Sequence, residues 1–411
     1  MTTTLAAHGG PRTLNVDGPH YQWPTVDDSL EEALRVQLHR SLSDRDARGV
    51  IGEYERAFAA FVGVPHAISF ASGTAAIHAM SRIAGLKPGD AIVAPAYTFF
   101  ATASPFGFDG IQVLFADADT CGNVTAQTIA QQLQSNVKAV IVTHMWGNPC
   151  RMDEIAALCT ERGLLLLEDC SHAHFASWSG QRAGTFGDMA VFSTNQKAIT
   201  TGEGGMLVTR SDRFRELALL YGHYNKRCLT EIDPGAEFYP FAFTGMGLKH
   251  RITTLGAAIG LHQLARADDI QARRRTVLDT FVKGLDGNPV ITPVSTPAGQ
   301  GEHGLYVIGL RFHVENATVT RQEFIDLCVA EGAHEVDAPG STRDISGEPL
   351  FARHDPFAPW QSGHVEQAML PGVRAFQGSF LKIPIWGYPG DQELVEGYLA
   401  ALNKVTGAVS R

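Results

Sequence analysis

A lysine in a polar loop between two apolar stretches is the residue of this chain best suited to covalent chemistry. Residues 189–192 form an apolar run of β character, Lys197 follows in the loop, and a glycine-rich turn leads into a second apolar run at residues 206–208. Partial burial between two strands disfavours the ammonium form of a lysine and leaves a nucleophilic amine, which a Schiff base requires. Taken alone, the same lysine would more often be a surface residue of a β-hairpin.

A carboxylate at the end of the most hydrophobic run is the second candidate. Glu168 and Asp169 close the leucines at residues 164–167, and a carboxylate buried there is costly unless it is paired or hydrogen-bonded. A pyridinium nitrogen would suit Asp169, because the carboxylate keeps the ring protonated and therefore a good electron sink. Asp169 could instead cap the segment that follows it, and the two roles are about equally common for an isolated aspartate. His172 could orient Asp169 or contact a cofactor, and a structural role for it is nearly as common.

Two further segments offer what a phosphorylated ring would need. Ser72, Gly73 and Thr74 follow one apolar run and open a helical pattern, where free N–H groups point at an anion and the glycine lets backbone approach it. The same residue types also cap helices that bind nothing. Phe99 follows another apolar run and could stack on a planar ring, although a core position is commoner for an isolated aromatic.

The order of these parts favours a pyridoxal phosphate (PLP) enzyme. An anion-binding turn comes first, then an aromatic, then a carboxylate at a strand end, and finally the lysine. No Gly-x-Gly-x-x-Gly follows the first apolar run, so a nicotinamide-binding site lacks its phosphate fingerprint.

The elements that must position these residues alternate between short apolar runs and stretches of helical spacing. Such alternation predicts a mostly parallel sheet covered by helices, with the ligand beyond the carboxyl ends of the strands. We expect strands at residues 67–70, 91–95, 112–116, 139–143 and 164–167, and helices at residues 73–84, 125–133 and 152–159.

A second, smaller unit is expected in the last third of the chain. A helix at residues 251–264 with a continuation through residue 275 leads into it, and residues 339–371, rich in Pro, Gly and Asp, are expected to form a long loop near a substrate entrance. The mixed part contains a predicted strand at residues 305–312 and predicted helices at residues 321–331 and 392–403. The chain divides into an N-terminal leader and arm (1–35), a large cofactor-binding domain (36–270) and a small C-terminal domain (271–411).

Composition narrows the class of protein. With 411 residues, 44% of them hydrophobic and 18% charged, the chain is typical of a globular protein with a large core. The net charge of −10 argues against nucleic acid or an anionic membrane as the main partner. Residues 1–12 lack the pattern of a secretory signal, and no apolar run approaches the roughly 20 residues of a membrane span. A cytoplasmic protein is therefore expected. The six cysteines include no Cys-x-x-Cys pair, so reduced thiols and no metal site are expected.

Together these segments resemble the DegT/DnrJ/EryC1/StrS family of PLP-dependent aminotransferases, strongly over residues 53–264 and more weakly to residue 405. The resemblance implies an α/β fold of PLP fold type I, with a mostly parallel sheet of the seven-stranded type flanked by helices and a smaller α/β C-terminal domain. It implies that Lys197 binds PLP covalently, as an internal aldimine, and that Asp169 contacts the ring nitrogen. The other implied cofactor contacts are Phe99 over the ring, His172 beside it, and Ser72, Gly73, Thr74 and Ser193 at the phosphate.

Two positions depart from the family pattern. The family's serine usually stands five residues before the lysine, whereas Ser193 stands four before Lys197, so Thr194 or Asn195 could take its place at the phosphate. Lys249 stands where the family commonly has an asparagine that contacts the phosphate of the neighbouring subunit's cofactor. A lysine could do so as a point charge, or it could indicate an unusual substrate. A homodimer with shared active sites is expected.

The activity implied by the resemblance is a ping-pong transamination. The amino group would pass from glutamate or glutamine to a ketone or aldehyde of a sugar, a cyclitol or another small carbonyl compound, in secondary-metabolite or amino-sugar biosynthesis. Candidates for the pocket of this keto acceptor are Tyr97, His144, Trp146 and His174. Two alternatives remain open. One is a PLP enzyme of another reaction type, such as a sugar dehydratase, although family dehydratases usually carry His in place of the lysine. The other is a non-catalytic PLP-binding protein.

Overall fold

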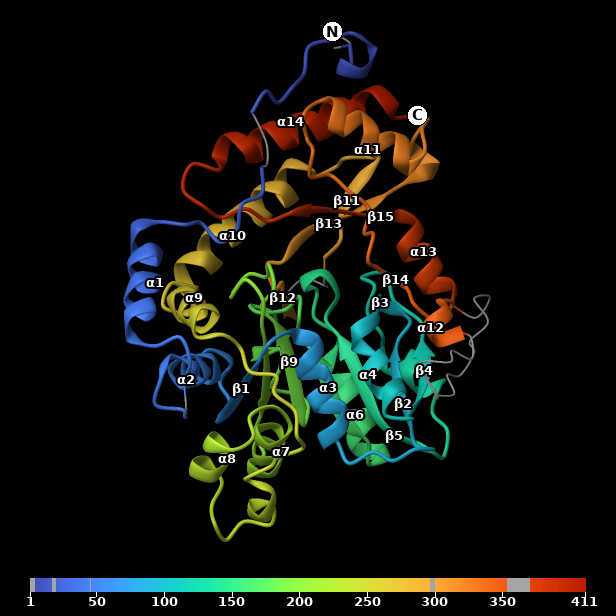
Figure 1. Ribbon diagram of the computed structural model, residues 1–411. Coiled ribbons are helices and arrows are strands. Elements are labelled where there is room, and N and C mark those ends of the chain that lie inside the picture. Colours follow the sequence, from blue (N-terminus) through green and yellow to red (C-terminus); the bar gives the residue numbers. More distant parts are fainter. Residues whose placement is uncertain (1–3, 17–19, 45, 296–299, 353–369) are drawn as a thin grey trace.

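A seven-stranded sheet forms the centre of the computed structural model, which describes residues 4–16, 20–44, 46–295, 300–352 and 370–411 (Figure 1). Its strands are β1 (His66–Phe70), β2 (Ala91–Pro95), β4 (Gln112–Ala116), β5 (Val137–Thr143), β6 (Leu165–Asp169), β9 (Met189–Ser193) and β10 (Gly205–Thr209). The order is β1-β10-β9-β6-β5-β2-β4, and only β10 runs antiparallel to its neighbours. The predicted mostly parallel sheet is confirmed.

Helices cover both faces of this sheet, which explains why its strands are apolar on both sides. Along β9, Val191 packs into the core formed with α3 (Gly73–Ile83), α4 (Ser104–Phe108) and α7 (Asp212–Gly222). The next residue, Phe192, packs against α2 (Val50–Val62) and α9 (Thr254–Leu264) on the other face. Near the other edge of the sheet, α5 (Ala126–Ala130) and α6 (Met152–Arg162) cover the strands on that second face.

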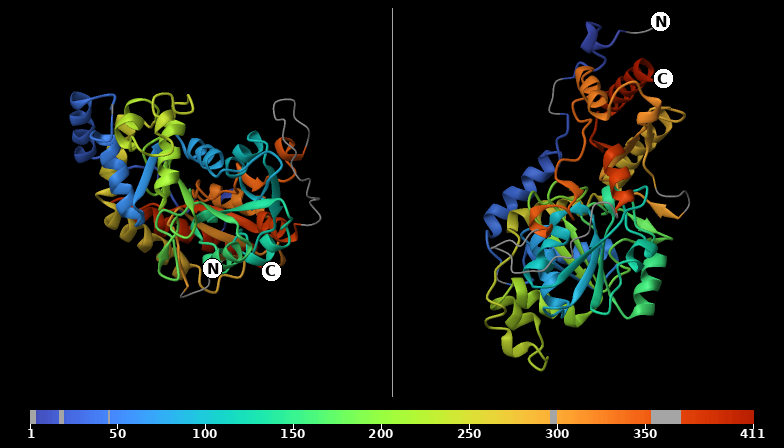
Figure 2. Two further views of the ribbon diagram at one scale, coloured as in Figure 1. Left: turned by 90° about the horizontal axis from the view of Figure 1, so that it is seen from below. Right: turned by 90° about the vertical axis from the view of Figure 1, so that its right-hand side faces the viewer.

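A smaller antiparallel sheet with the order β11-β13-β15 belongs to the second half of the chain. It consists of β11 (Ile291–Pro293), β13 (Val307–Phe312) and β15 (Phe380–Pro384) and shares a core with α10 (Ala267–Gly284), α11 (Arg321–Ala330) and α14 (Gln392–Val409). Leu5 and Leu14 of the N-terminal segment are buried in the same core. Figure 1 shows this part above the large sheet, and both panels of Figure 2 show the N- and C-terminal segments close together there.

Shorter elements complete the described chain. They are α1 (Asp28–Arg40), β3 (Tyr97–Phe99), β7 (Ser177–Trp178), β8 (Gln181–Arg182), α8 (Lys226–Glu231), β12 (Gly301–Glu302), β14 (Thr342–Asp344), α12 (Pro349–Ala352) and α13 (Pro371–Ser379). Among the helices described, none has the length and apolar character needed to cross a bilayer.

Several predicted boundaries differ from the observed ones. The strand expected at residues 164–167 extends through Asp169, so the two carboxylates belong to β6 itself. The helix expected to run through residue 275 breaks at Arg266, whose backbone (φ −113°, ψ 13°) is not helical, and continues as α10. The expected long loop contains β14, which pairs with β3, and α12, while residues 353–369 lie outside the described part. The domain limits at residues 35 and 270 stay a prediction.

Candidate active site

A cavity of about 530 Å³ lies at the C-terminal ends of the parallel strands, below the small sheet. Ten residues singled out from the sequence line it, namely Ser72, Gly73, Thr74, Phe99, Trp146, Asp169, His172, Ser193, Asn195 and Lys197. They come from five separate connections of the large sheet, and the parallel arrangement brings these connections to one edge. A larger hollow of about 900 Å³, between the N-terminal segment, α11 and α14, contains none of them.

Asp169 is a buried carboxylate held by hydroxyl groups. The hydroxyl of Thr102 donates to Oδ2 at 2.7 Å, and the hydroxyl and backbone N–H of Ser171 donate to Oδ1 at 2.6 and 3.0 Å. Thr98 connects the hydroxyl of Thr102 to that of Thr143. No cationic side chain of the described residues forms an ion pair with Asp169. A buried anion without a counter-charge is suited to binding a protonated ring nitrogen from the cavity.

The N-terminus of α3 lies at another wall of the cavity. The hydroxyl of Ser72 caps the helix by accepting the N–H of Ala75 at 3.0 Å, and the preceding N–H groups of the first turn have no partner within the helix. A Cβ added at Gly73 would lie 2.8 Å from the Cβ of Ser193, so these two residues are in contact. Ser193 therefore lies at the helix start although it precedes Lys197 by only four residues.

Lys197 is half-buried, and its amine meets a tyrosine from the small sheet. Nζ donates to the hydroxyl of Tyr306 at 2.9 Å and lies 4.2 Å from the centre of that ring. The backbone conformation before the lysine is unusual, since Gln196 has φ +45°. A side chain held by its tip and by a constrained backbone has few orientations left, as a group that transfers protons requires.

His172 stacks on two aromatic side chains of the cavity wall. Its ring stacks on Tyr306 at 4.2 Å and on Trp146 at 5.1 Å. The backbone N–H of Trp146 points at its Nδ1 at 3.4 Å, which assigns the ring proton to Nε2. Burial, and next the nearby Lys197, hold the pKa of His172 well below its usual range. The ring is neutral and contributes a flat face and one N–H.

Three of the four residues predicted to form the acceptor pocket do not line the cavity. Tyr97 is buried, and its hydroxyl is 3.3 Å from the indole nitrogen of Trp146. His174 is buried against Phe192, and burial lowers its pKa to about 3. His144 is fully buried and does not line the cavity. Of the four, Trp146 lines the cavity and the other three are enclosed by protein, so the predicted substrate contact of those three stays a prediction that this cavity does not support.

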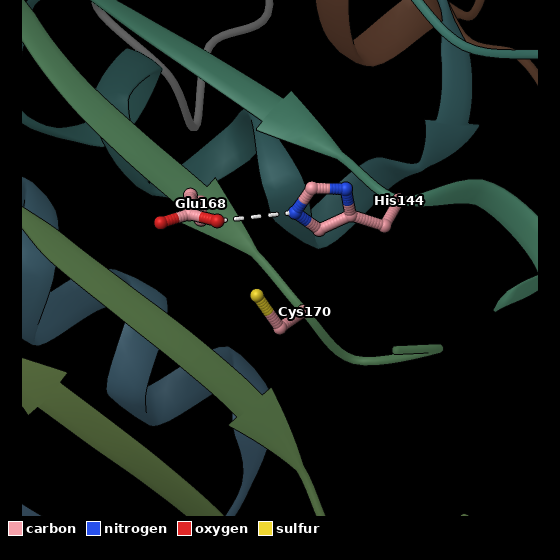
Figure 3. A group of neighbouring side chains, drawn as sticks. All are labelled: His144, Glu168 and Cys170. Atoms are coloured by element: carbon pink, nitrogen blue, oxygen red, sulfur yellow. Dashed lines mark hydrogen bonds and ion pairs between the residues drawn. The ribbon is translucent and has the colours of Figure 1, made fainter. Parts of the chain in front are cut away.

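Figure 3 shows His144 hydrogen-bonded to Glu168, with Cys170 nearby. The backbone N–H of Cys150 donates to Nδ1 at 3.0 Å, so Nε2 carries the proton and donates to Glu168 at 3.2 Å. Glu168 also accepts three backbone N–H groups, from Gly184, Phe186 and Gly187. Cys170 completes a buried trio whose potential ligand atoms lie within 4.8 Å of one another.

The side chains of His144, Glu168 and Cys170 are suited to holding the neighbouring backbone segments together rather than to binding a metal. Both imidazole nitrogens of His144 are engaged, and burial raises the pKa of the Cys170 thiol well above its usual range. A metal would need a free imidazole lone pair and a thiolate. The network instead joins β6 to the segment before β9, immediately beside Asp169.

Lys249 and Phe99 complete the predicted set. Phe99 is half-buried in the cavity wall, next to Phe100. Lys249 is exposed, does not line the cavity of its own chain, and follows a segment of exposed apolar residues. Its predicted role at a neighbouring subunit stays a prediction.

Sequence reasoning did not identify three residues that contact the site, namely Tyr306, Lys382 and Trp23. Tyr306 and Lys382 line the cavity from the small sheet, and the indole N–H of Trp23 donates to the backbone carbonyl of Lys197 at 2.8 Å. Tyr306 and Trp23 lie 109 and 174 residues from Lys197 along the chain. The apolar pattern near Tyr306 predicts a strand, but no local feature of the sequence indicates which sheet edge Tyr306 faces.

Comparison with known proteins now adds to this geometry. Residues 41–335 match the DegT/DnrJ/EryC1/StrS aminotransferase family, and this match covers well over half of the chain. The chain belongs to this family. Membership confirms the prediction of an aminotransferase, and the family implies PLP as the cofactor.

Individual relatives of this aminotransferase cover most of its length. GDP-perosamine synthase of Caulobacter vibrioides is 33% identical over 73% of this chain and 76% of its own. A candidate L-glutamine:3-amino-2,3-dideoxy-scyllo-inosose aminotransferase of Micromonospora echinospora is 27% identical over 83% of this chain and 80% of its own. The solved aminotransferase of Psychrobacter cryohalolentis superposes with a TM-score of 0.82, covers 95% of this chain and 100% of its own, and is 23% identical. That likeness confirms the fold.

Proposed function

We propose that this aminotransferase uses PLP to transfer the amino group of glutamate or glutamine to a keto group of a sugar or cyclitol, in amino-sugar or secondary-metabolite biosynthesis. One observation carries the proposal. A single cavity is lined by a lysine, by a buried carboxylate that lacks an ion-pair partner among the described residues, and by the start of a helix. At that helix start Gly73 leaves room that a larger side chain would fill. These are the partners needed by the aldehyde, the ring nitrogen and the phosphate of one cofactor.

PLP, when bound, supplies an electron sink for the negative charge that develops on the carbon next to the transferred nitrogen. Asp169 would hold the ring nitrogen, and its hydroxyl contacts keep the carboxylate pointed into the cavity. Gly73, Thr74 and Ser193 would hold the phosphate, and Phe99 a face of the ring. His172, being neutral, adds no positive charge that would disfavour the protonated ring.

Lys197 is the residue proposed to move the proton. Nζ accepts the proton that leaves the α-carbon of the amino donor and holds it until it is returned. Tyr306 is a positioning residue, because accepting one N–H of the amine directs the nitrogen lone pair away from the tyrosine. Its hydroxyl oxygen also stabilises the amine once the amine has taken up the proton.

A homodimer is the proposed assembly, and exposed apolar side chains support it. Phe241, Phe243, Met246 and Leu248 are 57%, 66%, 41% and 39% exposed within one stretch of chain that leads to Lys249. Grouped exposed hydrophobic residues usually mark an interface. Burial of this stretch against a second copy would bring Lys249 to the surface of that copy.

The two classes of relative support two kinds of acceptor, a nucleotide-linked keto-sugar and a keto-cyclitol. A dehydratase reaction is less well supported, because Lys197 is present and is already oriented by Tyr306. A screen of both acceptor classes, with the product identified by mass, would decide between them.

The covalent role of Lys197 is tested by Lys197→Ala. The purified variant is mixed with PLP and glutamate, and pyridoxamine phosphate and 2-oxoglutarate are measured. We expect formation of both to cease, whereas Lys138→Ala, an exposed lysine at the start of β5, should behave as the unchanged chain. Transamination at the original rate without Lys197 would overturn the proposal.

A further inference from the structure

A second lysine in the cavity wall has no role in the scheme above. Lys382 lies in β15 between Leu381 and Ile383, which are buried in the core of the small sheet. Because side chains alternate between the two faces of a strand, Lys382 lies on the face away from that core, where it lines the cavity. Its side chain is 27% exposed.

The partner of Lys382 is Asp337, and their ion pair can open easily. Nζ lies 3.1 Å from Oδ2, and the two backbones exchange hydrogen bonds of 3.1 and 2.9 Å, which keep the side chains adjacent. The Asp337 side chain is 59% exposed. An ion pair of this exposure contributes little to stability, because water solvates both groups almost as well. An anion entering the cavity can therefore displace Asp337.

The other positive groups of the cavity are already committed. Lys197 and Lys382 are the two cationic side chains among the described residues that line it. In the proposed function Lys197 reacts with the cofactor, and the α3 N-terminus binds the phosphate. Lys382 is then the cation left for an anionic group of a substrate. Glutamate and glutamine both carry an α-carboxylate, whereas the keto group that accepts nitrogen is neutral.

We propose that Lys382 binds the α-carboxylate of the amino donor and that Asp337 takes over Lys382 when this carboxylate leaves. The inference rests on the proposed function for the identity of the donor. Both substrates use the same cavity in turn, so a carboxylate site must also tolerate the neutral, hydroxyl-bearing ring of a sugar or cyclitol. The re-formed pair offers N–H donors and a carboxylate acceptor to hydroxyl groups, and no uncompensated charge remains.

The first test measures binding of glutarate, a dicarboxylate that lacks the reacting amine, to the PLP-loaded enzyme by titration calorimetry. Lys382→Gln should weaken glutarate binding about tenfold to hundredfold, the range expected for a lost hydrogen bond between charged groups. Lys382→Arg should retain affinity within severalfold, and the exposed Lys138→Gln should match the original enzyme. Unchanged affinity in Lys382→Gln would overturn the proposal.

Asp337→Asn gives the sharper result, because it removes the competitor and leaves the lysine. Glutarate should bind as tightly as before or up to about tenfold more tightly. If the pair only supported the fold, Asp337→Asn would weaken binding as much as Lys382→Gln does, and that result would overturn the proposal. Thermal melting of each variant checks folding; should Lys382→Gln not fold, Lys382→Met takes its place, and unchanged glutarate affinity in that variant would likewise overturn the proposal.

Single-turnover kinetics separate the donor from the acceptor. In Lys382→Gln the glutamate concentration at half-maximal rate should rise by the factor seen for glutarate, while the rate at saturation changes less than about threefold. If only the affinity for the carbonyl substrate falls, the lysine binds an anion of that substrate and the proposal is wrong. An enzyme that binds glutarate through Lys382 but never converts glutamate would contradict the proposed function and leave the carboxylate site in place.

Discussion

The indole N–H of Trp23 donates a 2.8 Å hydrogen bond to the backbone carbonyl of Lys197. Trp23 precedes α1, and its ring lies 4.2 Å from the guanidinium of Arg274, which is fully buried. Arg274 donates in turn to the carbonyl of Leu305 at 3.1 Å, the residue before Tyr306. One cluster thus holds the backbone of the lysine and the tyrosine that meets its amine.

Loss of the indole N–H should impair catalysis more than folding. We expect Trp23→Phe to lower kcat about three- to tenfold, since a lost hydrogen bond contributes ~1 kcal/mol and the lysine gains freedom. Trp386→Phe is the matched control, because Trp386 donates to the carbonyl of His20 at 2.9 Å in the core of the small sheet. The control should lose thermal stability and keep kcat; equal effects on kcat would contradict a positioning role for Trp23.

Removal of the Tyr306 hydroxyl should affect the proton-transfer step. Tyr306→Phe keeps the ring that stacks on His172 and deletes the acceptor 2.9 Å from Nζ of Lys197. We expect kcat to fall about tenfold to hundredfold and the isotope effect with α-deuterated glutamate to increase. Tyr97→Phe, which also loses a buried hydroxyl but lies outside the cavity, should leave the isotope effect unchanged.

Asp169→Asn should lower enzymatic activity without lowering the stability of the fold. The substitution keeps the size of the side chain and removes a buried charge that has no ion-pair partner among the described residues. We expect turnover to fall on the order of 100-fold or more, and the melting temperature of the cofactor-free protein to stay equal or rise. A large drop in the melting temperature of the cofactor-free variant would mean that Asp169 serves mainly the fold.

Gly73→Ala should damage the anion site alone. The added Cβ would lie 2.8 Å from that of Ser193, so the β9 end must shift away from the start of α3. We expect PLP to bind at least about tenfold more weakly, as followed by titration of the absorbance of the bound cofactor. Gly407→Ala in α14 meets nothing within 4 Å and should instead stabilise the chain by up to ~1 kcal/mol. Unchanged PLP affinity in Gly73→Ala would argue against a phosphate site there.

Acid should destabilise the protein through buried neutral histidines. Burial lowers the pKa of His174 and of His303 to about 3. Between pH 3 and the ordinary histidine pKa near 6.5 the unfolded chain binds more protons, so stability falls with falling pH by up to ~1.4 kcal/mol per pH unit for each histidine.

The pH dependence is checked by urea unfolding at pH 7 and pH 5. In the folded chain Nδ1 of His303 accepts the N–H of Leu305 at 2.9 Å, and His303→Gln retains an acceptor for that bond. The variant should lose less stability between the two pH values than the original chain does. An identical loss would show that His303 does not contribute to this slope.

Much of the site was determined by sequence, because its parts are local. The turn at Ser72, the strand end at Asp169 and the loop at Lys197 each combine a short apolar run with the polar residues that follow it. A parallel sheet brings such strand ends to one edge whatever the rest of the chain does. Their order along the chain therefore sufficed to predict the family and the fold, and the comparisons confirm both.

Tertiary structure alone decided the remaining contacts, since these depend on how distant surfaces pack. His144 stands in sequence where a ligand contact is expected, yet its ring is buried and hydrogen-bonded to Glu168. Tyr306 directly precedes β13 and Lys382 lies within β15, and the apolar pattern of these strands does not indicate which side meets a cavity at the other sheet. Trp23 meets Lys197 across 174 residues, and its ring also lies against the guanidinium of Arg274, which comes from a third part of the chain. Periodicity within one element carries no information about such pairings.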